Sequence, residues 1–262
     1  MRRRNSEERL MKILFVALAT AFLFTGCVTK LTVENSAVRV PVQGTATYAV
    51  GVIENRPYVL SGKKNDGYEG IFRALYGIPS SMENIEKKKF SDYIGDRIAQ
   101  GFQNAGYKVT KLTIPKGTIE SDTVSRIKSS AADYAFTLRM NDWRFDWGGF
   151  IPLSWQFWYD VDVSVYSGNG ELLATHSFVG KDIPPVAGND SIFNNSVKHY
   201  QTKFDEFLSD PEIRNALKGI KSTAAESTTP KGRLEQLKAL FDAGLITEKE
   251  YADKKAVILK GL

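Results

Sequence analysis

The chain has 262 residues, a formal net charge of +5 and a single cysteine. One cysteine cannot form an intrachain disulfide or a paired-cysteine zinc site, so both are excluded. The first 26 residues hold five of the 35 Lys and Arg side chains but only two of the 30 Asp and Glu side chains. The rest of the chain therefore has a net charge of about +2, which removes the argument for a nucleic-acid-binding surface.

A short hydrophobic segment ends just before the lone cysteine, Cys27. Lys12 precedes an apolar stretch over residues 13–24, and Thr25-Gly26 follows it. Twelve apolar residues span roughly 18 Å as a helix, which is short of the ~30 Å hydrocarbon core, so a transmembrane anchor is disfavoured. This order predicts a signal peptide over residues 1–26, cleaved before the cysteine.

The segment resembles a bacterial lipoprotein signal, although Phe24 stands where that pattern most often has Leu. The resemblance implies lipidation of Cys27, with acyl chains on its thiol and on its new amine, so that the membrane is a partner. Val28 follows the cysteine, which in the enterobacterial pattern implies the periplasmic face of the outer membrane. Met11 offers a second start for the same signal.

The first half of the mature chain alternates between strand and helix patterns. Residues 27–45 show neither period and are expected to form a tether. Phe90, Ile94, Ile98 and Phe102 are spaced four apart, and Gly106 suits the end of their helix. In chain order we expect a strand over 46–54, helices over 67–76 and 84–105, a strand over 107–112 and a helix over 121–130.

A three-stranded meander is expected next. Apolar residues fall on even positions over 134–140 and on odd positions over 143–147, so a β-bulge is expected near Asn141-Asp142. The second strand, over 155–165, has aromatic and β-branched residues at odd positions, and Asp160 and Asp162 on its other face. Asn169-Gly170 then predicts a hairpin before a third strand over 172–182.

A helix over 193–207 follows, and Asp210-Pro211 starts another. The resulting order predicts an α+β domain over residues 46–221, with helices packed on a largely antiparallel sheet. This topology resembles that of periplasmic accessory domains of envelope lipoproteins, such as auxiliary components of transport systems.

The C-terminal segment is predicted to be a separate helical hairpin over residues 231–262, after a small polar linker over 222–230. Gly244 ends its first helix, and Thr247 to Glu250 form a capping box that opens the second. The residues expected to bind a partner are Leu234, Leu237, Leu240, Phe241, Ile246, Tyr251, Ile258 and Leu259.

This hairpin resembles the short C-terminal domain family, SHOCT, in its leucine-containing helix, its Gly244-Leu245-Ile246-Thr247 run, Glu250-Tyr251 and the pair Lys254-Lys255. The resemblance implies a role in oligomerisation or partner binding. Each helix has only about a dozen residues, which is marginal alone in water, so its apolar stripe needs a partner. That partner is another copy, a different protein or the main domain.

Catalytic patterns are sparse. His176 and His199 are the only histidines, and Ser177 is expected on the opposite strand face from His176, so no catalytic residue is assigned. Asp160 and Asp162 share a face near two further aspartates, Asp142 and Asp146, which we interpret as a solvated surface rather than a metal site. No cofactor fingerprint is present.

The turn between the first two meander strands carries Phe150 and Ile151, and Trp158 falls on the polar face of the second strand. These three residues are a candidate aromatic surface for lipid or a partner. The pattern as a whole favours a lipid-anchored, non-enzymatic envelope protein with an assembly hairpin. The alternatives are a periplasmic hydrolase or a ligand sensor, the latter with an apolar pocket beneath Trp143 and Trp155.

Overall fold

The computed structural model describes residues 31–148, 154–186 and 190–222, and single positions of the C-terminal segment. Those positions are Leu234, Leu237, Lys238, Phe241, Asp242, Glu248, Tyr251, Ala252 and Lys255. Within these residues seven strands form one sheet: β1 (Thr47–Glu54), β2 (Tyr68–Arg73), β3 (Pro79–Glu83), β4 (Lys108–Lys111), β5 (Tyr134–Gly148), β6 (Ser154–Ser167) and β7 (Leu172–Asp182). The helices are α2 (Pro57–Leu60), α3 (Phe90–Asn104), α4 (Glu120–Ser129), α5 (Ile192–Ser209) and α6 (Pro211–Ala216), with a 3-10 turn η1 (Leu75–Gly77).

Strand β5 organises the sheet because its two edges are used differently. Along one edge it pairs antiparallel with β6 over its whole length, and β6 in turn pairs with β7. Along the other edge the first half of β5 pairs with β1 and the second half with β2, both in parallel. The register slips between Met140 and Asp142, which confirms the bulge predicted there.

The prediction of a largely antiparallel sheet is wrong, because the sheet is mixed. Strand β1 is parallel to both β4 and β5, and β2 is parallel to β5. Helices α3 and α4 lie in the connections that lead from β1 to β4 and from β4 to β5. Such helical crossovers bring the chain back to the same end of the sheet, which is the condition for parallel pairing.

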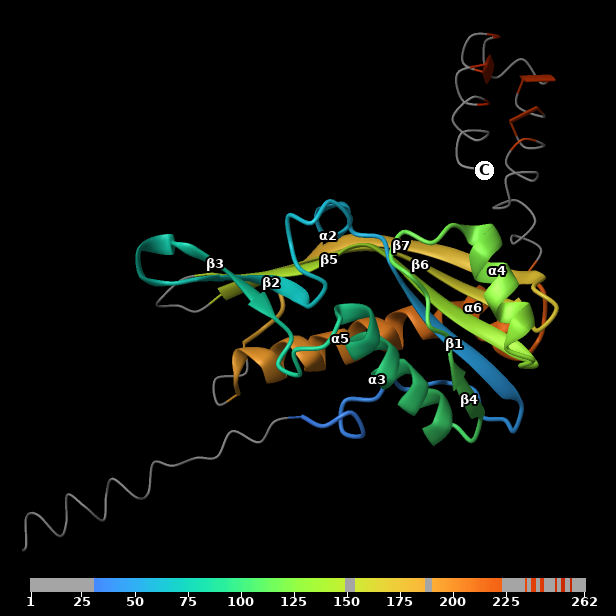
Figure 1. Ribbon diagram of the computed structural model, residues 1–262, viewed down its shortest axis with the longest axis horizontal. Helices are drawn as coiled ribbons and strands as arrows, with labels where there is room; N and C mark the ends of the chain where they lie inside the picture. Colours follow the sequence, from blue (N-terminus) through green and yellow to red (C-terminus); the bar gives the residue numbers. More distant parts are fainter. Residues whose placement is uncertain are drawn as a thin grey trace, which may run out of the picture. The chain divides into compact units, whose positions relative to one another are not determined.

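Helices cover the two faces of the sheet unequally (Figure 1). Helices α3 and α5 pack on one face, where their apolar sides meet the inward residues of β1, β5 and β6 in the main core. Helix α4 lies on the other face, where Ile127 packs with Ala49, Ala135 and Tyr166 in a smaller cluster. The second face is otherwise polar along β5, β6 and β7, and it carries the site described below.

The chain packs on the domain well before β1 begins. Val38 is 3% exposed, and its N–H donates to the carbonyl of Arg97 in α3. A Cβ on Gly101 would lie 2.3 Å from the carbonyl oxygen of Val38, so glycine allows this close approach. From Leu31 onward the segment expected to be a tether is therefore part of the packed domain.

Two helix predictions differ from the structure. The expected helix over 67–76 is strand β2, because pairing with β5 brings the Gly70 backbone against Phe145 and overrides local helix propensity. The expected helix over 84–105 begins only at Phe90. Asn84 holds the preceding residues in a turn, since its side-chain amide donates to the carbonyl of Lys88 and its side-chain oxygen accepts from the N–H of that residue.

Candidate functional site

Four of the residues predicted to form the apolar stripe of the C-terminal hairpin are among the described positions: Leu234, Leu237, Phe241 and Tyr251. Leu234, Leu237 and Phe241 are helical, and Leu237 is 5% exposed. The ring of Phe241 stacks on that of Tyr251 with centroids 4.8 Å apart. The structure thus brings together residues from the two predicted helices of the hairpin. The other predicted contact residues, Leu240, Ile246, Ile258 and Leu259, lie outside the described residues.

Trp158 lies on the polar face of β6, as the alternation predicts. The guanidinium carbon of Arg144 lies 4.7 Å from its ring, and the ammonium nitrogen of Lys181 lies 5.0 Å from it. The two cations come from β5 and β7, which flank β6. The other residues of the predicted aromatic surface, Phe150 and Ile151, lie outside the described residues.

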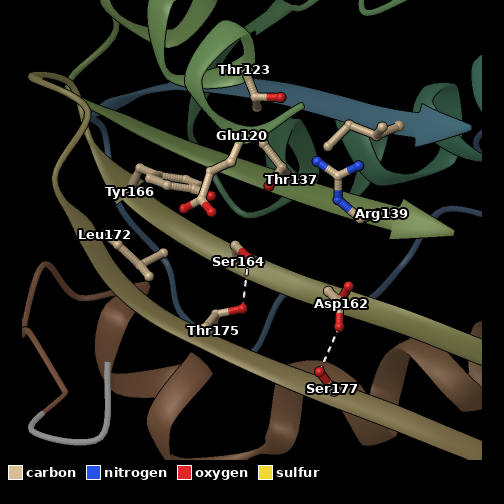
Figure 2. A pocket seen from close by; sticks show the side chains of 11 residues that line it. Glu120, Thr123, Thr137, Arg139, Asp162, Ser164, Tyr166, Leu172, Thr175 and Ser177 are labelled. Carbon is tan, nitrogen blue, oxygen red and sulfur yellow. Dashed lines mark hydrogen bonds between the residues drawn. The ribbon is translucent and has the colours of Figure 1, made fainter. Parts of the chain in front are cut away.

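A polar pocket of about 160 Å³ lies on this same face, between the N-terminal turn of α4 and the strands (Figure 2). Residues from β1, α4, β5, β6 and β7 line it. Most of the lining is hydroxyl: Thr123, Thr137, Ser164, Tyr166, Thr175 and Ser177. The arrangement suits a small, highly polar molecule, because such a lining offers both donors and acceptors.

Three charged side chains face this pocket: Glu120 from α4, Arg139 from β5 and Asp162 from β6. Burial and, to a smaller extent, the negative charge of Glu120 raise the pKa of the Tyr166 phenol to about 12, while Arg139 acts in the opposite direction. Both charges therefore act on the space in front of Tyr166. Sequence reasoning missed Glu120 and Arg139, because they are 19 positions apart on different elements and form no motif.

The aspartates of this face are held by neighbouring donors. The amide of Asn141 donates to both Asp160 and Asp162 at 3.1 Å. Asp142 accepts from Tyr58 and Arg144, while Asp146 pairs with Arg73 at 2.6 Å. Across the described ranges, no group of three or more His, Cys, Asp and Glu side chains is arranged to hold a metal ion.

Each histidine is paired with a carboxylate. His176 lies 3.1 Å from Asp210, the residue that also caps α6, and His199 lies 3.0 Å from Asp182. Burial lowers the pKa of His199, although Asp182 opposes this shift. Ser177 donates to Asp162 on the other face of β7 from the ring of His176. The structure therefore does not bring His176 and the neighbouring serine together.

In the part of the chain that the structure describes, side chains of α5 pack against Trp143 and Trp155, where an apolar pocket was expected. Trp143 contacts the rings of Tyr200 and Phe204, and Trp155 contacts the ring of His199. Both indoles are buried in the main core. They contribute apolar area to the packing of the domain.

A buried group of charges inside the core was also not predicted. Arg56 and Glu54 form an ion pair at 2.6 Å beneath the sheet, and Arg97 pairs with Glu86 at 2.8 Å. Glu69 is fully buried and accepts a hydrogen bond from the hydroxyl of Tyr200 at 2.9 Å. Burial raises the pKa of Glu69 to about 7, against the lowering effects of Tyr200 and two arginines.

Residues 233–259 match the family model described as Short C-terminal domain, SHOCT. This confirms the family resemblance predicted for the C-terminal segment. No curated protein matches the chain. Among the described residues, no helix is long and apolar enough to cross a membrane.

Several solved structures are similar to the chain. A DUF330 protein from Xanthomonas campestris gives a TM-score of 0.40 at 10% identity, covering 70% of this chain and 91% of its own. The hypothetical protein CT253 from Chlamydia trachomatis gives 0.36 at 12% identity, with 64% and 96% covered. Lipoprotein GNA1162 from Neisseria meningitidis gives 0.32 at 9% identity, with 64% and 100% covered. These scores are too low to transfer a function to this chain.

Proposed function

We propose that this protein is a lipid-anchored, non-enzymatic binding module of the cell envelope, and that its C-terminal hairpin joins it to another copy or to a partner protein. The anchor is Cys27, supported by the lipoprotein-like order of basic, apolar and small residues before it. Several acyl chains, each gaining ~0.8 kcal/mol per buried methylene, would hold the protein at the membrane durably. Val28 supports the periplasmic face of the outer membrane.

The observation that carries the assembly role is the match of residues 233–259 to SHOCT, together with the contact between Phe241 and Tyr251. Two short helices bury little apolar surface between themselves, so the remaining apolar residues gain most from a further surface. The small polar linker over 222–230 gives the hairpin reach to find one.

Light scattering on residues 28–262 and on a truncation to 28–222 tests this role. We expect a larger multiple of the monomer mass for the longer protein and a monomer for the shorter one. The truncation retains the described domain through Ser222, whose N–H donates to the carbonyl of Leu173 in β7. If both proteins are monomeric, self-association is rejected. The hairpin would then be used to search for a different protein as its partner.

A pair of variants separates a specific contact from general stickiness. Leu240→Asp places a carboxylate in the predicted apolar stripe and is expected to dissociate the assembly. Lys238→Asp places the same group on the same helix at a side chain that is 64% exposed. It replaces an exposed ion pair with Asp242 by a like-charge pair, which costs only about 0.5 kcal/mol, and should leave the assembly intact. Equal dissociation by both variants would contradict a contact through the stripe.

A further inference from the structure

The pocket beside α4 holds charges of opposite sign that do not pair with each other. Elsewhere in the described domain, Arg56, Arg73, Arg97 and Arg144 each lie 2.6–3.1 Å from a carboxylate. Arg139 is half-buried and instead donates to the carbonyl of Thr118 at 3.0 Å. Among the described residues, no carboxylate lies within ion-pair distance of Arg139. It is therefore an arginine whose remaining donors face the pocket.

The separation between Arg139 and Asp162 is built into the sheet. The two residues are register partners on β5 and β6, where opposite charges normally attract each other. Ser177 donates to one oxygen of Asp162 at 2.5 Å, and Asn141 donates to the other at 3.1 Å. Figure 2 shows the carboxylate turned towards Ser177 and the guanidinium directed away from it. Fixed neighbours thus hold the two charges apart.

Glu120 supplies a second carboxylate from the opposite wall, at the start of α4. Within the described residues it has no ion-pair partner. The floor between the three charges carries hydroxyls, including Ser164 and Thr175, which hydrogen-bond to each other at 2.8 Å. At a liquid volume of about 30 Å³ per water, the 160 Å³ pocket holds roughly five waters, which is the size of a small organic molecule.

We propose that this pocket binds a cationic amino acid, with its carboxylate on Arg139 and its two ammonium groups on Glu120 and Asp162. Charge complementarity selects this class. A simple anion would face two carboxylates, and a simple amine would leave the guanidinium without an anionic partner. The polar lining disfavours an apolar ligand. This proposal concerns the α4 face and is independent of the role proposed for the hairpin.

Isothermal titration of the protein comprising residues 28–262 tests the proposal, with L-lysine as the probe. L-norleucine lacks the side-chain ammonium, and 1,5-diaminopentane lacks the carboxylate. We expect lysine to bind at least about tenfold more tightly than either, because each lost partner removes a charge-assisted hydrogen bond. Failure of lysine to bind at about 1 mM, or equal binding of all three compounds, would overturn the proposal.

Variants assign each contact. Arg139→Gln should weaken lysine about tenfold or more and remove the preference over 1,5-diaminopentane, while Glu120→Gln should reduce the preference over norleucine. Asp122→Asn and Arg126→Gln change the same charges elsewhere on α4 and should leave binding unchanged. Glu120 is exposed, so Glu120→Gln is expected to remain folded. This variant therefore tests the site even if Arg139→Gln disturbs the fold by losing the hydrogen bond to Thr118. Unchanged binding in Glu120→Gln would reject the site.

Discussion

The two faces of strand β6 differ in what they contribute. On one face Trp155, Phe157 and the following odd residues to Val165 pack against α5 and neighbouring strands in the main core. On the other face Trp158, Asp160, Asp162 and Ser164 meet cations, amides and hydroxyls. Burial of apolar area makes the first face the source of stability, while the second keeps polar groups accessible for binding. The same strand therefore separates stability from recognition.

The largest expected effect is a loss of stability when an indole on the core face of the sheet is truncated. Trp143 of β5 is such a residue. Trp143 is 0% exposed and contacts Phe157 with ring centroids 5.0 Å apart. Trp143→Ala should lower the free energy of unfolding by about 3–5 kcal/mol, because the lost side chain leaves a cavity. Urea unfolding followed by circular dichroism measures this. Trp158→Ala on the polar face is the matched control and should cost less than about 2 kcal/mol; equal losses would contradict the comparison.

The next largest effect concerns pH. The pKa of Glu69 is raised from 4.5 to about 7, so the folded state keeps a proton that the unfolded chain releases between these values. The stability contributed by this proton is present below pH 4.5 and is lost as pH rises through about 7. Glu69→Gln should remove this loss, worth about 3 kcal/mol, so its stability relative to wild type rises between pH 4.5 and 8.

Urea unfolding of wild type and of Glu69→Gln across this pH range gives the difference between their free energies of unfolding. Subtracting wild type from variant cancels the opposite trend from Glu86 and Asp96, whose pKa values are lowered by their cationic partners. A flat difference for Glu69→Gln would show that the buried carboxyl is not protonated in the folded state.

The smallest effect is expected on the polar face. Ser177→Ala removes an exposed hydrogen bond to Asp162, and should change the free energy of unfolding by less than about 0.5 kcal/mol. The same variant frees one oxygen of Asp162 and should alter lysine binding measurably. A stability loss as large as that of Trp143→Ala would show that the polar face also holds the fold together.

The sequence predicted those parts of the fold in which local pattern and tertiary packing agree. Strand β7, helix α5 and the Asp210 cap were all predicted, because apolar periodicity or a capping side chain specifies each one locally. Strand β2 was not, since its conformation depends on pairing with β5, 75 positions away at Gly70 and Phe145. Parallel pairing likewise leaves no local signal.

Prediction of the candidate sites followed the same division. The residues proposed for contact in the C-terminal hairpin are recognisable in the sequence because their pattern lies within one short segment. The pocket is not, because Glu120, Arg139 and Asp162 come from three elements and are ordinary surface residues in their local sequence. Only the sheet register places Arg139 opposite Asp162, and only the donors around them keep the two charges separate.

Because β1 and β2 share one edge of β5, neither strand can complete its pairing until β5 has been synthesised. Strands β1 and β2 are synthesised more than 60 residues before β5, yet both need it as a neighbour. Closing loops of this length costs conformational entropy before any pairing compensates for it, which slows folding. The growing chain therefore leaves the edges of β1 and β2 that pair with β5 unpaired until β5 has been made.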